Sequence, residues 1–163
     1  MARLVLSDAS PLIGLSIVGG LPWLKALFGK VWMPPQVRDE VHSGQVSRGE
    51  DAIRAALARK TLVVWDRPVP ELPLPPLDAG ESACIRIGRA HKGPTLLLMD
   101  ERAGRAVAQD SGLKVAGTAA VIGMAQQHGL ISSAREAFAL LHGSDFRISA
   151  EVIRTVLARV GEA

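Results

Sequence analysis

The sequence has one cysteine, no tyrosine and no long hydrophobic run, and each of these absences excludes a class of protein. The single cysteine, Cys84, cannot form a disulfide within the chain and leaves no cysteine cluster for zinc, so we expect a reducing, cytoplasmic setting. The longest apolar stretch, residues 12–27, is interrupted by glycine, proline and lysine, which predicts no membrane span. The scattered histidines form no zinc-binding helix motif, and the lack of a glycine-rich phosphate loop argues against nucleotide-driven chemistry.

The composition is that of a globular domain. Of the 163 residues, 48% are hydrophobic and 21% are charged. A chain of this length buries roughly 70% of the surface that it exposes when unfolded, so we expect one domain over residues 1–163. The net charge of +3 comes from 19 basic and 16 acidic residues, a mild excess that favours a polyanionic partner without identifying one.

Short apolar runs alternate with segments of helical length along the chain. Strands that alternate with helices predict crossover connections that feed a parallel sheet, so the expected fold class is α/β. The expected strands are residues 3–6, 31–33, 61–65, 95–99 and 113–115. Residues 66–77 contain five prolines, which exclude an inner strand or a helix and indicate an extended surface loop, either a stiff connection or a partner-binding segment.

Capping signals indicate where helices begin. Ser10 stands before a proline and is typical of an N-cap residue. Spacings of three residues between a capping side chain and a glutamate predict two capping boxes. The two pairs are Ser47 with Glu50 and Asp78 with Glu81. A proline at position 35 opens a further short helix.

Apolar residues at helical spacing suggest two features beyond a simple core. The last helix, expected at about residues 149–161, carries one apolar stripe. The stripe contains Val152, Ile153, Val156, Leu157 and Val160. Two short helices near the N-terminus, residues 12–18 and 23–28, have more apolar positions than one buried stripe requires. Either they meet a second subunit in a homodimer, or they belong to a thick local core.

Acidic residues follow two of the expected strands. Asp8 comes directly after the first strand and Asp100 after the fourth. Ligands of open parallel sheets bind outside the carboxyl ends of the strands, so the two side chains would converge if the strands are neighbours. Glu40 and Glu81, each on a helix that follows, could reach the same crevice. The structural alternatives are turn and N-cap roles for the aspartates and solvated helix faces for the glutamates.

Several short motifs together resemble the PIN-domain family, in its VapC-like toxin ribonuclease branch. They are VLSDASPL at 5–12, PPQV at 34–37 followed by Glu40, GE at 80–81, LMDERAGR at 98–105, GT at 117–118 and FRIS at 146–149. Their order and spacing cover nearly the whole chain. The resemblance implies a three-layer α/β/α domain with a central parallel sheet.

The resemblance also implies a function. It predicts a metal-dependent endoribonuclease that hydrolyses RNA phosphodiester bonds, the toxin of a type II toxin-antitoxin pair with a small antitoxin protein as partner. The implied catalytic and metal-binding residues are Asp8, Glu40, Glu81 and Asp100, and the accessory residues are Thr118, Glu101 and Ser10. This chain departs from many relatives in having glutamate at position 81, where others have aspartate.

Physical chemistry independently favours a cation among these acids. Two carboxylates about 4 Å apart repel each other by roughly 4 kcal/mol at an effective dielectric constant near 20, so a cluster of them takes up protons or binds a cation. Oxygen ligands without histidine or cysteine suit Mg²⁺ or Mn²⁺ better than zinc. A water held by such a metal can attack a phosphodiester.

Basic residues on two helices could hold the phosphates of an RNA. They are Arg86, Arg89, Arg102 and Arg105, and solvated helix faces explain them equally well. With so few aromatic residues we expect no base-stacking platform, and recognition of the backbone instead. The alternative functions are a catalytically silent PIN-like module that binds RNA or protein, and a switch phosphorylated at Asp8.

Overall fold

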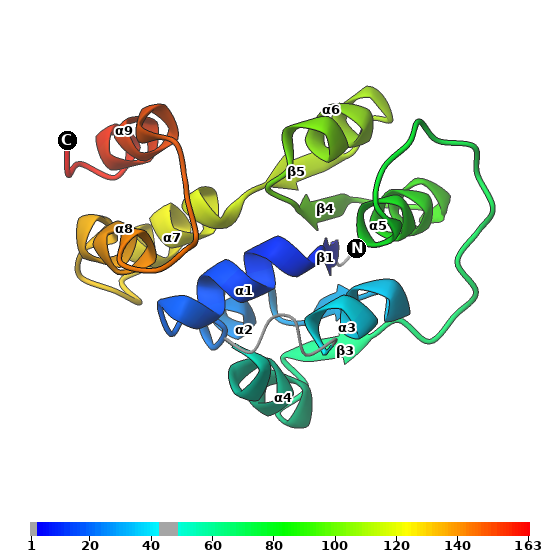
Figure 1. Cartoon of the computed structure of the whole chain (residues 1–163), viewed down its shortest axis with the longest axis horizontal. Helices are drawn as coiled ribbons and strands as arrows, with labels where there is room; N and C mark the ends of the chain where they lie inside the picture. The colour runs from blue at the N-terminus through cyan, green and yellow to red at the C-terminus, as the bar shows by residue number, and fades with distance from the viewer. Residues whose placement is uncertain (1–2, 43–48) are drawn as a thin grey trace.

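The computed structural model describes residues 3–42 and 49–163 of the chain. Within these ranges five parallel strands form one sheet in the order β3-β2-β1-β4-β5. The strands are β1 (Leu4–Ser7), β2 (Val31–Met33), β3 (Leu62–Val64), β4 (Thr95–Leu98) and β5 (Lys114–Ala116). Each lies where the sequence predicted a strand, give or take one residue, which confirms the expected α/β class (Figure 1).

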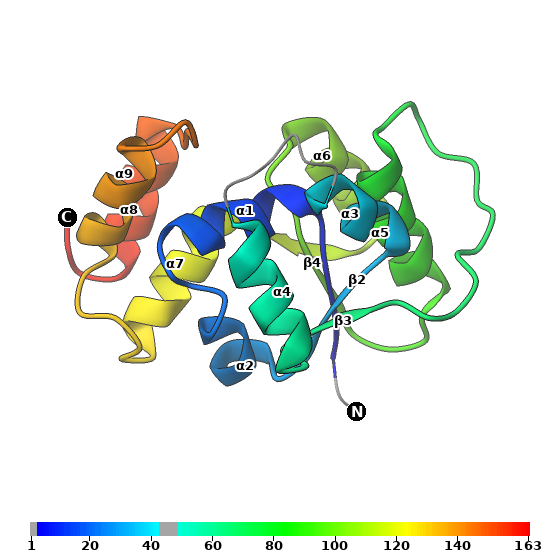
Figure 2. The same cartoon turned by 60° about the horizontal axis from the view of Figure 1, so that its bottom comes forward.

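Helices cover both faces of this sheet. In the described part of the chain they are α1 (Ala9–Ile17), α2 (Trp23–Phe28), α3 (Pro35–Val41), α4 (Glu50–Ala58), α5 (Ala79–Ala90), α6 (Arg102–Asp110), α7 (Thr118–Gln127), α8 (Ala134–His142) and α9 (Ala150–Arg159). Right-handed crossovers place helices on opposite faces when the strand order changes direction. In Figure 2 the strands run between α5 and α6 on one side and α1, α2 and α4 on the other, which is the predicted three-layer arrangement.

The centre of the core is the pair β1 and β4. Every residue of both strands is buried, because the sheet is covered on both faces, and parallel strands in that position become nearly continuous apolar runs. Leu6, Leu97 and Leu98 have no exposed surface. The two strands are paired over their whole length, from Leu4 opposite Thr95 to Ser7 opposite Leu98, so their carboxyl ends lie side by side.

The predicted helix starts are partly correct. Asp78 caps α5, since its side chain accepts a hydrogen bond from the backbone N–H of Glu81 at 2.8 Å. The N-cap role predicted for Ser10 is wrong: α1 already begins at Ala9, and the Ser10 hydroxyl is used in a tertiary hydrogen bond described below. Ser47 lies outside the described residues, and α4 begins after Gly49, which has a left-handed φ of 86°.

The C-terminal helices α8 and α9 pack on α7 and α1, at the end of the molecule farthest from α5 (Figures 1 and 2). A side chain at Gly123 of α7 would lie 2.8 Å from Val156, so this glycine allows α9 to approach closely. The predicted apolar stripe of α9 is only partly buried, because Val152 is 44% exposed.

The two other expectations concerned the proline-rich segment and the N-terminal helices. The connection between β3 and α5 loops out beyond α5 (Figure 1), and its Leu72 carbonyl accepts a hydrogen bond from Arg86 Nε at 2.9 Å. The large apolar residues exposed in the described chain are Leu130, Leu140 and Val152, none of them in α1 or α2, although Leu27 and Phe28 of α2 are only half-buried. The choice between a thick local core and a dimer contact there stays a prediction. No helix among the described residues is long and apolar enough to cross a membrane.

Candidate metal centre

The order of the strands reverses between the neighbouring strands β1 and β4. The strands that follow β1 in the chain, β2 and β3, lie on one side of it, and β4 and β5 lie on the other. A crevice forms outside the carboxyl ends of strands at such a point, because the following helices go to opposite faces. Asp8 directly follows β1, and its backbone N–H donates to the Leu98 carbonyl of β4 at 3.0 Å. Asp100 follows β4 by two residues. Both predicted strand-end acids therefore lie at the switch point.

Three carboxylates meet at this crevice. Ligand oxygens of Asp8, Asp78 and Glu81 all lie within 4.8 Å of one another. Asp78 is the N-cap of α5 and Glu81 lies in its first turn, a spacing of three residues that puts the two side chains on the same side of the helix start. The cluster therefore joins the end of a central strand to the beginning of a helix on the opposite face from α1.

Each of the two buried members of the cluster has one carboxylate oxygen without a hydrogen-bond donor in the described part of the chain. Asp8 is 3% exposed and Glu81 is 4% exposed, and among the described residues no donor reaches Asp8 Oδ1 or Glu81 Oε2. A buried polar atom without a partner costs free energy, and an ionised carboxylate costs more than a neutral group. A bound cation satisfies both oxygens at once. The donor set, all oxygen, fits Mg²⁺ or Mn²⁺.

Protonation behaviour agrees with this geometry. Burial, with a smaller contribution from the neighbouring carboxylates, raises the pKa of Asp8 from 3.8 to about 7. Burial and the charge of Asp78 likewise raise the pKa of Glu81 from 4.5 to about 7. Both shifts have the same cause, which is negative charge concentrated where water is excluded. Without a cation, the protein therefore favours protons on these groups up to neutral pH.

Glycines allow the surrounding helices to approach the carboxylates. A Cβ on Gly80 would lie 2.8 Å from Asp8 Oδ1 and 3.5 Å from Glu40 Oε2. A Cβ on Gly104 of α6 would overlap the Glu81 carboxylate and lie 2.8 Å from the Met99 sulfur. Side chains at either glycine would fill the space that the acids occupy.

Glu40 lies at the rim of the cluster. It comes from α3, is exposed, and its charge contributes to the raised pKa of Asp8. Burial and the charge of Asp78 raise its own pKa as well. The structure thus brings Glu40 close to Asp8, as the sequence predicted, but at the solvent side of the three clustered acids.

Asp100 is held differently from the three clustered acids. Its Oδ1 accepts a hydrogen bond from the Thr118 backbone N–H at 2.7 Å. Its Oδ2 accepts one from the Thr118 hydroxyl at 2.8 Å and one from the Ser10 hydroxyl at 2.8 Å. The two hydroxyl residues named from the sequence therefore contact Asp100 directly. Ser10 also lies two residues after Asp8, so a single turn of α1 connects the two parts of the crevice.

A groove of about 990 Å³ opens beside Asp100, between α6 and α9. Glu101, Arg102 and Arg105 line it, and Arg105 also donates to the Met99 carbonyl at 3.0 Å. Two of the four arginines predicted to rim the site thus face the groove. Arg86 and Arg89 lie on α5 outside its lining, with Arg86 bound to the proline-rich connection.

Sequence reasoning did not assign a ligand role to Asp78, which it treated only as a helix cap. The signal was present, because an aspartate and a glutamate three residues apart at a helix start place both carboxylates on one side. It also missed Arg147 and Arg159, which line the groove from the C-terminal segment. Only the tertiary packing of that segment brings them there.

Comparison with known proteins gives one positive finding. A family model described as PIN domain matches residues 4–162 of the chain. The match includes every acidic residue of the crevice. No curated protein and no solved structure matches the chain.

Proposed function

Because the chain belongs to the PIN-domain family, we propose that it is a metal-dependent endoribonuclease that hydrolyses RNA phosphodiester bonds. The family membership confirms the resemblance read from the sequence and brings a nuclease-type fold. The VapC-like branch is compatible with it. Three further parts of the proposal are a toxin role in a type II toxin-antitoxin pair, a small antitoxin protein as partner, and a homodimer.

Asp8, Asp78 and Glu81 would hold the Mg²⁺ or Mn²⁺ ion, with Glu40 beside them at the rim. The fit rests on the two buried oxygens without donors, since a divalent cation satisfies them and removes the repulsion between the carboxylates. When bound, such an ion supplies an activated water and stabilises the charge that develops on the phosphate.

The residues around Asp100 hold its carboxylate in position beside the groove. Three hydrogen bonds from Ser10 and Thr118 fix the Asp100 carboxylate at the mouth of the groove. A carboxylate fixed in this way can accept a hydrogen bond from the attacking water and keep it in line with the phosphate. Glu101, next in the chain, is exposed and lines the same groove, where it has an accessory role beside Asp100.

Arginines bind the RNA backbone on either side of the acids. Arg102 and Arg105 line the groove next to Asp100, where their charges complement phosphates. Arg89 is exposed on α5. The Nε of Arg86 donates a hydrogen bond to the Leu72 carbonyl of the proline-rich connection. An antitoxin that places an arginine against the clustered carboxylates would stop the reaction by taking the place of the cation.

The observation that carries the proposal is the buried, donor-free oxygen of Asp8 beside two further carboxylates. The test is cleavage of a mixed RNA substrate by the purified protein in Mn²⁺ and in EDTA, with Asp8→Asn and, as a matched control, Asp110→Asn at the exposed end of α6. We expect cleavage by the wild type and the control in Mn²⁺ only. An Asp8→Asn variant that still cleaves at saturating Mn²⁺ would contradict the proposal. RNA that is bound but never cut would indicate the silent binding module instead.

A further inference from the structure

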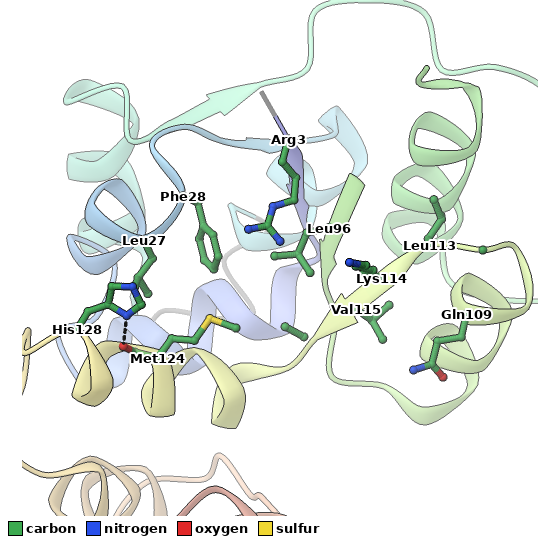
Figure 3. Close-up of a pocket in the computed structure, with 12 residues that line it drawn as sticks. Arg3, Leu27, Phe28, Leu96, Gln109, Leu113, Lys114, Val115, Met124 and His128 are labelled. Carbon is green, nitrogen blue, oxygen red and sulfur yellow. Dashed lines mark hydrogen bonds between the residues drawn. The ribbon is translucent and has the colours of Figure 1, made fainter. Parts of the chain in front are cut away.

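A second hollow, of about 760 Å³, lies at the opposite end of the sheet from the acids. Arg3 precedes β1 and Lys114 begins β5, so the hollow opens at the amino ends of these strands. Figure 3 shows its side chains coming from α2, α7 and the edge of the sheet. We refer to it as the basic apolar hollow.

The floor of the basic apolar hollow is apolar. Leu27 and Phe28 of α2, Val115 of β5 and Met124 of α7 line it, and all four are half-buried. In Figure 3 the Phe28 ring and the Met124 side chain both point toward its middle. Methionine in such a surface adapts to differently shaped partners, because its side chain is flexible and polarizable. The surface is therefore suited to bury apolar side chains of another molecule.

The rim of the hollow is basic. Arg3 and Lys114 are exposed, and within the described residues neither side chain has a hydrogen bond or an ion pair. His128 also lies on the rim, and its Nδ1 donates to the Met124 carbonyl at 2.8 Å. No carboxylate is found among the described residues that line the hollow. Unpaired cations around an apolar floor complement a ligand that is acidic and apolar at once.

β5 adds an open main-chain edge beside this surface. It is the last strand of the sheet in the described part of the chain, so one side of its backbone is not paired with another strand. An extended segment that pairs with an edge strand obtains main-chain hydrogen bonds, and its alternate side chains enter neighbouring pockets. The edge and the floor can thus be used by the same partner segment.

We propose that the basic apolar hollow docks a short segment of a partner protein that carries carboxylates beside apolar side chains. A protein segment fits better than a nucleic acid, because the side chains of this floor carry no hydrogen-bond donor for sugar and phosphate groups, whereas apolar side chains can be buried against them. It also fits better than a small ligand, because the hollow is bordered by exposed residues along an open strand edge and would leave much of a small molecule in water. Docking here leaves the acidic crevice free.

The test uses synthetic peptides of about twelve residues, which can pair with the edge of β5 in an extended form. One alternates leucine and glutamate, a second has lysine in place of glutamate, and a third has serine in place of leucine. Fluorescence anisotropy measures the binding of each to the full chain. We expect the acidic apolar peptide alone to bind, and Lys114→Glu to weaken it about fivefold or more, since a rim charge mainly tunes complementarity.

Two variants make the result specific. Lys114→Arg keeps the charge and should retain binding, and Arg154→Glu, on the exposed side of α9, changes the net charge by the same amount away from the hollow and should also retain it. Equal binding of the lysine and glutamate peptides would overturn the proposal, because apolar contact alone would explain it. The proposal would also be overturned if Lys114→Glu lost affinity for a single-stranded RNA while its affinity for the peptides stayed the same, since the hollow would then bind nucleic acid.

Discussion

Asp8, with Glu81 of α5 beside it, follows β1, whereas Asp100 follows the neighbouring strand β4, and the hydrogen bonds of these two sets of carboxylates differ. Asp8 and Glu81 are buried, and one oxygen of each has no donor among residues 3–42 and 49–163, whereas Asp100 accepts three hydrogen bonds from Ser10 and Thr118. The first set is unstable when ionised, and the second has its charge stabilised by the protein itself. The difference separates acids whose charge a cation would offset from an acid that the protein's own donors already hold in position.

The strongest test of this contrast is the pH dependence of the metal-free protein. Burial raises the pKa of Asp8 and of Glu81 to about 7, so between about pH 4 and pH 7 the folded state holds protons that the unfolded state has lost. Stability must therefore fall as the pH rises through this window, and the loss is complete above about pH 7. We expect a decrease on the order of 2–4 kcal/mol between pH 5 and pH 8, measured by urea unfolding in EDTA.

Two controls accompany the pH measurement. Saturating Mn²⁺ should remove most of the decrease, because the cation replaces the protons in the folded state. Asp8→Asn should flatten the profile in EDTA, since one of the two titrating groups is gone. A metal-free protein whose stability rises steadily from pH 5 to pH 8 would show that these carboxylates are not held unfavourably.

Close packing around Glu81 gives the next largest effect. In Gly104→Ala the new methyl group overlaps the Glu81 carboxylate and lies 2.8 Å from the Met99 sulfur. We expect a loss of stability of about 1–3 kcal/mol and a weakening of Mn²⁺ binding by about tenfold or more. Calorimetry measures both. The matched control is Gly143→Ala, whose methyl group would lie 3.5 Å from the Leu140 carbonyl oxygen, an ordinary contact, and should change neither quantity much.

Replacing each aspartate by asparagine should change the stability of the metal-free protein in opposite directions. Asp100→Asn turns an acceptor into a donor that faces the Thr118 and Ser10 hydrogen-bond donors, so we expect a loss of about 1–2 kcal/mol. Asp8→Asn removes a buried charge, one oxygen of which no donor among the described residues reaches, so we expect a gain of up to about 1 kcal/mol at pH 8. Urea unfolding in EDTA compares the two variants, and the same sign in both would remove the distinction drawn between them.

Much of the fold could be predicted from the sequence, because β1 and β4 are continuous apolar runs and their buried position leaves little choice of structure. Local patterns also located the starts of α3, α5 and α9. They failed at Ser10, because the local sequence of a serine that caps a helix does not differ from that of a serine whose hydroxyl makes a tertiary hydrogen bond. The Ser10 hydroxyl goes to Asp100, a residue far along the chain that only the pairing of β1 with β4 brings close.

The site was predicted less completely. The strand-end position of Asp8 and Asp100 followed from the α/β pattern, and both do lie at the switch point. The pattern could not distinguish a donor-free carboxylate from a hydrogen-bonded one, because Thr118 and Gly104 become neighbours of the acids only in the packed molecule. For the same reason Asp78 was predicted only as a helix cap, although its carboxylate both caps α5 and lies beside those of Asp8 and Glu81.

The smallest expected effect concerns the arginines. Like the carboxylates, they differ in whether their side chains are hydrogen-bonded within the protein. Arg102 is exposed at the groove, whereas Arg86 donates to the Leu72 carbonyl of the proline-rich connection. Arg102→Ala should weaken RNA binding by about threefold. It should also reduce the slope of the logarithm of the binding constant against the logarithm of the salt concentration by about one, the value for one lost phosphate contact. Arg86→Ala should leave both unchanged and instead make the connection more susceptible to proteolysis. Filter binding in Ca²⁺ across a salt series measures the RNA terms, and an equal loss in both variants would place the RNA across α5 as well as along the groove.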